Sequence, residues 1–200
     1  MASRYEKIVS DNLRKLYDRA TVNLDGLLPA VQKDNMFCFE AFGQPCRLST
    51  DGIQLGKLPQ TEVVGILISL YALHANDETC MLEPLKAYKD FPNSMPYAAA
   101  FTSHTQQVLV PEVEKIKSFQ QKIWTAMNGM DAGAIAGCDF SFVVYPLPKI
   151  ALCYIFYEAD DDFPASVTCL FSNNANSFLP MDALADVGEY TSKRILEILE

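Results

Sequence analysis

The chain has little of what metal, nucleic-acid and membrane sites require. It has two histidines, 16 basic residues against 25 acidic ones, and a formal net charge of −9 over 200 residues. Two histidines cannot supply a histidine-rich metal centre. The basic residues are scattered and form no stripe that could replace counterions along phosphates, so we expect no nucleic-acid partner. A membrane surface rich in anionic lipids is disfavoured for the same reason.

Long apolar runs are also missing. The most apolar helix-like run, Val63 to Ala75, is too short to cross a bilayer, which takes about 20 residues. Residues 1–17 are charged and amphipathic and lack the apolar segment of a signal peptide. We therefore expect a soluble, cytoplasmic protein.

Cysteine spacing does not indicate a metal cluster. None of the six cysteines forms a CxxC pair, and Cys38, Cys153 and Cys169 lie inside apolar, strand-like runs. Such placement is typical of buried, reduced thiols. A zinc or iron–sulfur site would have to be assembled from distant cysteines, a possibility that spacing alone leaves open.

Catalytic motifs are missing as well. The chain has no GxSxG, no GxGxxG that opens a helix, and no Ser or Thr after Gly56-Lys57 as a phosphate loop would need. The acid loop from Glu158 to Pro164 has three adjacent aspartates but no turn glycine, so we interpret it as a solvated hairpin tip rather than a calcium loop. No motif indicates an enzyme.

What is present predicts an α+β fold in a single domain, residues 1–200. We expect antiparallel sheets of about six strands, packed against four to five helices. The strands form an N-terminal meander, with a hairpin at Asp51-Gly52, and a C-terminal three-strand unit. Their predicted ranges are 36–42, 46–50, 53–55, 139–145, 150–157 and 166–171.

The predicted helices have recognisable start signals. The first begins at a capping box, Ser3 to Glu6. Pro59 is expected to open a helix that runs to His74 and, being apolar on most faces, lies buried at the centre. Further helices are expected over 97–108, from Pro111 to 127, and from Asp182 to the end of the chain.

The C-terminal unit predicts where polar residues lie. Ile150 to Tyr157 is almost wholly apolar and is expected to be a central strand buried on both faces. Antiparallel connections then place Asp139 and Glu158 at one end of this sheet and Ser172 to Asn174 at the other. Seven residues of strand separate the two ends by about 20 Å, so one small-molecule site cannot include both.

Six residues are candidates for ligand binding. Asp139 and Glu158 could act together at one end of the sheet, although Asp139 could instead close the preceding loop. Asn173 could present its amide to a ligand or form a turn. His74, at the end of the buried helix, could neutralise the helix C-terminus or ligate a tetrapyrrole metal, with Tyr71 and Phe101 nearby.

Several segments together resemble one family. GCDFSF (137–142), PLPKIALCYIFYEADDDFP (146–164) and LFSNNANSFLP (170–180) resemble the C-terminal block of the bacterial and archaeal family called domain of unknown function 3786. SLYALHA and FGQPCRLSTDG are similar to earlier parts of that family, so the resemblance covers about Phe39 to Tyr190. Ser172 stands where the family usually has aspartate, so no role of that aspartate carries over to this chain.

The resemblance implies a context rather than a reaction. Family members resemble proteins of anaerobes, and some are joined to an iron–sulfur domain. We therefore expect a non-catalytic binding or accessory domain of anaerobic metabolism. It would dock a corrinoid or iron–sulfur protein, or hold a planar cofactor such as a corrinoid beside Tyr71, His74 and Phe101. The alternatives are an enzyme that uses the carboxylates of Asp139 and Glu158, and a structural subunit of an oligomer.

Overall fold

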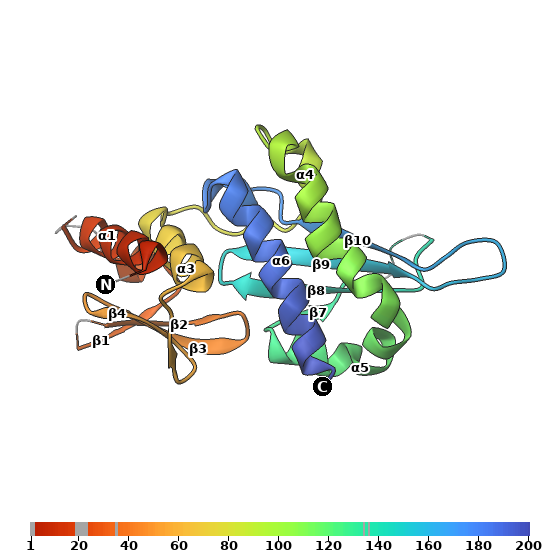
Figure 1. The fold of residues 1–200 in the computed structure, drawn as a ribbon, viewed down its shortest axis with the longest axis horizontal. Helices are drawn as coiled ribbons and strands as arrows, with labels where there is room; N and C mark the ends of the chain where they lie inside the picture. Colours follow the sequence, from red (N-terminus) through yellow and green to blue (C-terminus); the bar gives the residue numbers. More distant parts are fainter. Residues whose placement is uncertain (1–2, 19–23, 35, 134, 136) are drawn as a thin grey trace.

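Two antiparallel sheets form the framework of the protein. The computed structural model describes residues 3–18, 24–34, 36–133, 135 and 137–200. The first sheet has the strand order β1-β2-β3-β4-β5 and the second has the order β6-β10-β9-β8-β7. Helices cover one face of each sheet (Figure 1). The predicted α+β fold is confirmed, with short edge strands added to both predicted units.

The elements follow one another in two blocks. The first block contains α1 (Arg4–Asp18), α2 (Leu24–Leu27), β1 (Val31–Lys33), β2 (Met36–Ala41), β3 (Gln44–Ser49), β4 (Gly52–Leu55), β5 (Leu58–Pro59) and α3 (Val63–Leu73). The second contains β6 (Lys86–Ala87), η1 (Tyr88–Asp90), α4 (Met95–Phe101), η2 (Thr102–Gln106), η3 (Gln107–Glu112), α5 (Val113–Ala126), β7 (Met130–Asp131), β8 (Phe140–Leu147), β9 (Ile150–Tyr157), β10 (Ser166–Phe171), η4 (Ala175–Ser177) and α6 (Met181–Ile198).

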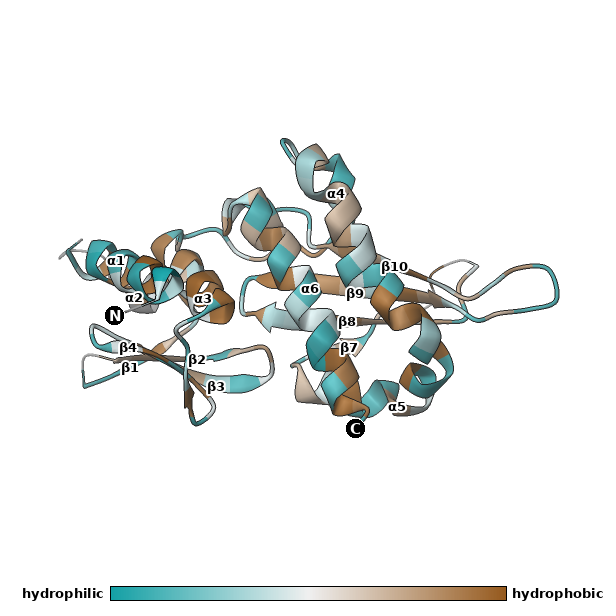
Figure 2. Cartoon of the chain, in the orientation of Figure 1, coloured by the Kyte–Doolittle hydropathy of each residue, from teal (hydrophilic) through white to brown (hydrophobic). Residues whose placement is uncertain are grey.

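Helices α1 and α3 pack together above the first sheet (Figure 1). The predicted capping box is confirmed, because the Glu6 N–H donates to Ser3 Oγ and the Ser3 N–H donates to Glu6 Oε2. Helix α3 is buried along most of its length and is coloured as hydrophobic in Figure 2. Within the layer, the buried Asn12 side chain of α1 donates to Ser69 Oγ of α3 at 3.0 Å.

The predicted start of the buried helix was wrong. Pro59 lies in the edge strand β5, opposite Gln54 of β4, and α3 begins only at Val63. A proline at a sheet edge has no ladder N–H to lose on the solvent side, so this position tolerates it as well as a first helical turn does.

Strand β9 is the centre of the second sheet, as predicted. It pairs with β8 on one side and β10 on the other, and Ile150 to Phe156 are all buried. Leu152, Tyr154 and Phe156 face the layer that contains α6. The residues between them face a smaller cluster, which loop residues cover on the opposite side of the sheet. Sequence alternation and burial on both faces therefore agree.

The segment after α4 is not a regular helix. The sequence predicts one helix over 97–108, but α4 ends at Phe101 and passes into a π-helical turn, η2, and then the 3₁₀ helix η3. Pro111 lies inside η3, so the predicted proline start of the next helix was wrong and α5 begins at Val113. In the part of the chain that the structure describes, no helix is long and apolar enough to cross a membrane.

The turn between β2 and β3 joins the two sheets. The Phe42 N–H donates to Pro146 O at 2.6 Å, near the end of β8. The Phe42 ring is fully buried and meets the ring of Tyr190 in α6 edge-on, with 4.7 Å between centroids. Because of this insertion, one apolar cluster includes side chains from both sheets.

Candidate functional site

Tyr71 and Phe101 are both inside the protein, but in different surroundings. Tyr71 is 1% exposed, lies against Phe39, and accepts a 3.1 Å hydrogen bond from the Lys149 N–H. Phe101 is 3% exposed and stacks on Tyr88, with 4.6 Å between ring centroids. Burial raises the pKa of the Tyr71 hydroxyl. Neither aromatic face is open to a planar ligand.

His74 lies where the sequence predicts, at the end of the buried helix. It is the C-terminal cap of α3, and its N–H donates to Leu70 O at 2.9 Å. Its side chain is exposed. The capping position agrees with a role at the helix terminus.

Asp139 and Glu158 do meet at one end of the second sheet, as predicted. The Glu158 N–H donates to Asp139 Oδ2 at 2.7 Å, and the Glu158 carboxylate pairs with Lys117 of α5. Asp139 is exposed, as are the aspartates of the neighbouring acid loop. The pair closes the end of a hairpin, and neither carboxylate is buried.

Asn173 lies at the opposite end and has a structural partner. Its side-chain amide donates to Pro84 O at 2.9 Å, and its backbone N–H donates to Met81 O at 2.7 Å. Next to it, the buried Ser172 hydroxyl accepts a 3.2 Å hydrogen bond from the Ala151 N–H of β9. These contacts fasten the segment before β6 to the end of β10.

The cysteines do not gather into a metal site. Cys153 is buried beneath the loop residues Cys80 and Cys138, and burial raises its pKa to about 12. A thiol with so high a pKa is a poor nucleophile at neutral pH. Among the described residues, no group of three histidine, cysteine or acidic side chains could hold a metal ion.

A cavity of about 480 Å³ opens between α4 and strand β10. We call it the α4–β10 groove. Its walls come from η1 and the end of β6, from α4 and η2, and from β10. The lining residues are Ala87, Tyr88, Lys89, Ala98, Ala99, Phe101, Thr102, Gln106, Thr168, Cys169 and Leu170. Its volume lies in the range of ligand pockets, and it combines an apolar floor with a few polar groups.

Close packing between η2 and α6 shapes the helical wall of this groove. Ser192 Oγ of α6 donates to the backbone oxygen of Thr105 at 2.7 Å and also contacts the Tyr154 hydroxyl at 3.0 Å. Gly188 lets the helices approach, since an added Cβ would lie 2.5 Å from Phe101 Cε2. A π-helical turn is rare and often marks a functional position.

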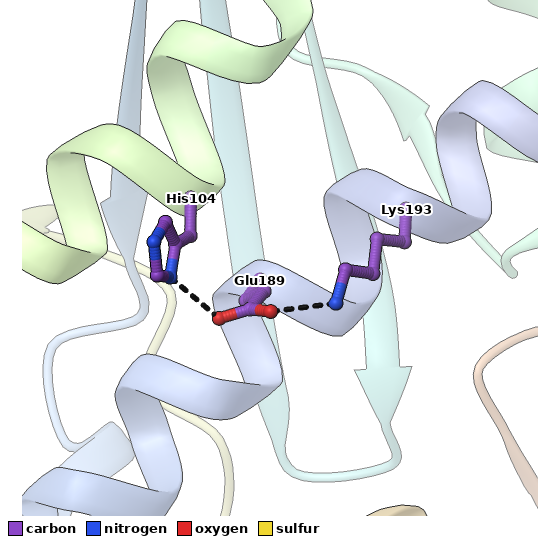
Figure 3. A network of polar contacts seen from close by, with 3 residues as sticks. All are labelled: His104, Glu189 and Lys193. Carbon is purple, nitrogen blue, oxygen red and sulfur yellow. Dashed lines mark hydrogen bonds and ion pairs between the residues drawn. The ribbon is translucent and has the colours of Figure 1, made fainter.

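A second cavity, of about 410 Å³, lies between the start of α3 and α6 and has acidic walls. Glu189 lines this cavity, and its carboxylate contacts the side chains of His104 and Lys193, as Figure 3 shows. His104 Nδ1 of η2 lies 2.9 Å from one carboxylate oxygen, and Lys193 Nζ donates to the other at 2.6 Å. This network ties η2 to α6 on the side away from the groove.

The two acidic groups of α6 in this cavity are perturbed in opposite directions. The hydrogen bond from Lys193, together with that from His104, lowers the pKa of Glu189. Loss of hydration, together with the nearby carboxylates of Glu189 and Asp182, raises the pKa of Asp186. The Asp186 side chain is still exposed overall, so we expect its effect on stability to be small.

Substitutions here should change stability with opposite signs. A lowered pKa means that ionised Glu189 stabilises the fold above its unfolded pKa, and that this contribution is lost as pH falls through the folded pKa. A raised pKa means that ionised Asp186 destabilises the fold at neutral pH. At pH 7 we expect Glu189→Gln to lower, and Asp186→Asn to raise, the free energy of unfolding by about 0.5 kcal/mol each.

Urea denaturation at low salt and in concentrated salt tests this pair. Salt screens the attraction of Lys193 and His104 for Glu189, so the Glu189→Gln difference should shrink, whereas the Asp186→Asn difference comes mainly from lost hydration and should change less. Equal signs for the two variants, or a Glu189→Gln difference that salt leaves unchanged, would contradict the assignment.

Sequence reasoning missed both cavities. Phe101 was the one predicted ligand residue that lies in the groove, and it lies there as part of the floor. The residues that make the opening are small or come from distant segments, such as Ala98, Ala99 and Thr168. The run of three alanines from Ala98 to Ala100 was the available signal, since small side chains on a helix permit a close approach or leave a space.

Comparison with known proteins gives a family. A family model described as "Domain of unknown function (DUF3786)" matches residues 25–194, which is most of the chain. No curated protein and no solved structure matches the chain. The resemblance seen in the sequence is thereby confirmed.

Proposed function

The chain belongs to the DUF3786 family, and on this premise we propose that the protein is a non-catalytic binding module whose ligand site is the α4–β10 groove. The groove is the observation that carries the proposal. It joins an apolar floor to polar groups at the rim, namely Lys89, Thr102 and Gln106. A few polar groups around an apolar concavity are typical of binding sites.

The contacts of the other candidate residues support binding rather than catalysis. Asp139, Glu158 and Asn173 each make hydrogen bonds that close a loop or fasten a segment. These contacts account for the polar residues at these positions without a ligand. The groove, by contrast, has walls from several elements and a volume that packing within this chain does not fill.

The class of partner that we propose comes from the family resemblance. It is a corrinoid or iron–sulfur protein of anaerobic metabolism, and docking is favoured over holding the cofactor itself. Tyr71 and Phe101 are 1% and 3% exposed, so neither offers a free ring face for stacking. We also propose that the protein is cytoplasmic, as such a partner would be. An oligomeric structural role stays a prediction, for which the exposed Tyr5 and Ile8 on α1 would be the first residues to examine.

Two alanines on one helix give a matched test. Ala99 lines the groove, while its neighbour Ala100 is exposed and is not among the lining residues. Ala99→Leu adds bulk inside the groove, and Ala100→Leu adds the same bulk outside it. Substitutions at such exposed helical positions usually change stability by about 0.5 kcal/mol or less.

We expect anoxic affinity capture from the native host to recover one or more proteins with the wild-type and Ala100→Leu baits. These proteins should be lost with the Ala99→Leu bait, and a corrinoid or iron–sulfur protein should be among them. Quantitative mass spectrometry provides the comparison. Identical recoveries on all three baits would refute the groove as the docking site.

Absorbance titration with cobalamin and with haem separates docking from cofactor binding. We expect no spectral change for the isolated protein with either compound. A saturable change that persists in both alanine variants would instead support a cofactor held elsewhere in the protein.

A further inference from the structure

We propose that Asn128 is a site of covalent modification. Its side-chain amide is protected from deamidation in the folded protein and is lost when the turn between α5 and β7 opens, and the acid that forms opposes Glu40 of β2. Asn128-Gly129 is the only Asn-Gly pair in the chain. Glycine has no side chain to hinder attack on the preceding amide and is conformationally free, which makes an asparagine before it especially reactive.

The reaction needs water and no other reagent. The Gly129 backbone nitrogen loses its proton and forms a bond to Asn128 Cγ, and the side-chain nitrogen leaves as ammonia. The cyclic succinimide that results takes up water at either of its carbonyl groups and opens to aspartate or isoaspartate. Overall, asparagine and water give an acid and ammonia, with no change in oxidation state.

In the folded protein the attacking nitrogen is held in a hydrogen bond. The Gly129 N–H donates to Trp124 O at 2.6 Å, at the C-terminus of α5. Asn128 has a φ of 54°, the left-handed conformation that commonly ends a helix. A Cβ added to Gly129 would lie 2.1 Å from Val143 O, so the backbone of the turn lies directly against β8. The nitrogen must give up its hydrogen bond before it can attack Asn128 Cγ.

The Asn128 side chain is held as well. Its Nδ2 donates to the carboxylate of Glu40 in β2, 88 positions earlier in the chain. A carboxylate only accepts hydrogen bonds, so the nitrogen end of the amide faces it. Both side chains are exposed, so water reaches the site. The contact lies where the first sheet adjoins α5, because Gly43, in the turn after β2, packs against Ala126.

Deamidation would convert this attraction into repulsion. Aspartate at position 128 has no side-chain N–H to donate, and its charge would face that of Glu40. It would also place a negative charge at the C-terminus of α5, which the helix dipole disfavours. Isoaspartate would add a backbone carbon to a turn that lies directly against β8. The modification, once formed in an open turn, therefore disfavours the return of the turn to the first sheet.

Peptide mass spectrometry on the wild-type protein tests the restraint. Samples are incubated in one neutral buffer with and without urea, and after digestion the amide, aspartate and isoaspartate forms at position 128 are separated and quantified. Because the folded protein reacts only from the opened turn, we expect its rate at Asn128 to be lower than the rate in urea by about tenfold or more. Glu40→Ala should raise the folded-state rate several-fold and leave the rate in urea unchanged. Gln54→Ala, at an exposed position in the same sheet, is the control.

An exchange of the two groups tests the partner. Asn128→Asp reproduces the product with an unaltered backbone and should lower the urea midpoint of unfolding. Adding Glu40→Gln should restore most of this loss, since the glutamine amide would donate to the new carboxylate. Glu40→Gln alone should change the midpoint little, because its carbonyl still accepts from Asn128. Restoration distinguishes the paired contact from the effect of charge at the helix end, which Glu40→Gln leaves in place.

Two results would overturn the inference. One is deamidation of Asn128 at the same rate in the folded and in the unfolded protein, which would show that the turn does not restrain it. The other is an Asn128→Asp variant that loses no stability, or one that Glu40→Gln does not restore. The rate measurement uses the wild-type protein, so it decides the matter even if Asn128→Asp does not fold.

Discussion

Phe101→Ala is expected to lower the free energy of unfolding by about 3–5 kcal/mol, as is usual for a buried aromatic ring. The ring is 3% exposed, stacks on Tyr88, and lies 5.5 Å from the Phe171 ring by centroid distance. Its removal would leave a void under the floor of the groove, between α4 and β10. The loss of stability combines the burial free energy of the removed ring atoms with the cost of the cavity that they leave.

Urea denaturation, followed by the fluorescence of the single tryptophan, Trp124, measures this loss. Tyr97→Ala on the same helix is the control, because Tyr97 is 39% exposed and should cost about 1 kcal/mol or less. If the variant does not fold, Phe101→Leu retains most of the apolar volume and should cost less. Equal costs for Phe101→Ala and Tyr97→Ala would show that the ring is not a core residue.

Gly188→Leu is the second substitution with a large expected effect. A Cβ at this position would lie 2.5 Å from Phe101 Cε2 and 2.8 Å from Thr105 Oγ1, so η2 would have to move away from α6. Overpacking of this kind typically costs about 1–3 kcal/mol. Gly188→Ala should cost less, because alanine in a helix gains about 1 kcal/mol over glycine and offsets part of the clash.

Hydrogen exchange provides a local measurement for Gly188→Leu. The amides of Thr102 to Gln106 should lose more protection than those of β9, whose protection should fall only by the loss in overall stability. Glu197→Leu, on the exposed side of α6, is the control. Unchanged exchange in η2 would contradict the close approach.

The two substitutions should also be coupled. Leucine at position 188 would point toward the space that the Phe101 ring vacates. The double variant should therefore be more stable than the sum of the two single effects predicts, by about 1 kcal/mol or more, as neighbouring residues in one packed site commonly are. Strict additivity would mean that the two residues do not share a contact.

Sequence signals predicted the parts of the fold that short stretches determine. The capping box at Ser3, the hairpin at Asp51-Gly52 and the buried strand β9 each depend on neighbours within a few residues. The π-helical turn η2 could not be predicted in this way. Its Thr105 carbonyl is held by Ser192, 87 positions further along the chain.

The candidate site was the least predictable part for the same reason. The groove brings together Ala87, Ala99 and Thr168, which share no periodic pattern in the sequence. The polar residues that the sequence did single out, Asp139 and Asn173, form contacts that hold loops in place. Polarity after a strand indicated a loop correctly, but it could not distinguish a loop contact from a ligand contact.

The contact between Phe42 and the last helix bears on whether the two halves of the protein can be produced separately. Its ring fills a socket beside Tyr190 that exists only when the last helix is present. A truncated product that stops before β6 would carry that ring into water, and a product that starts there would have a hollow in its place. We therefore expect each of the two segments to be less stable when it is expressed without the other.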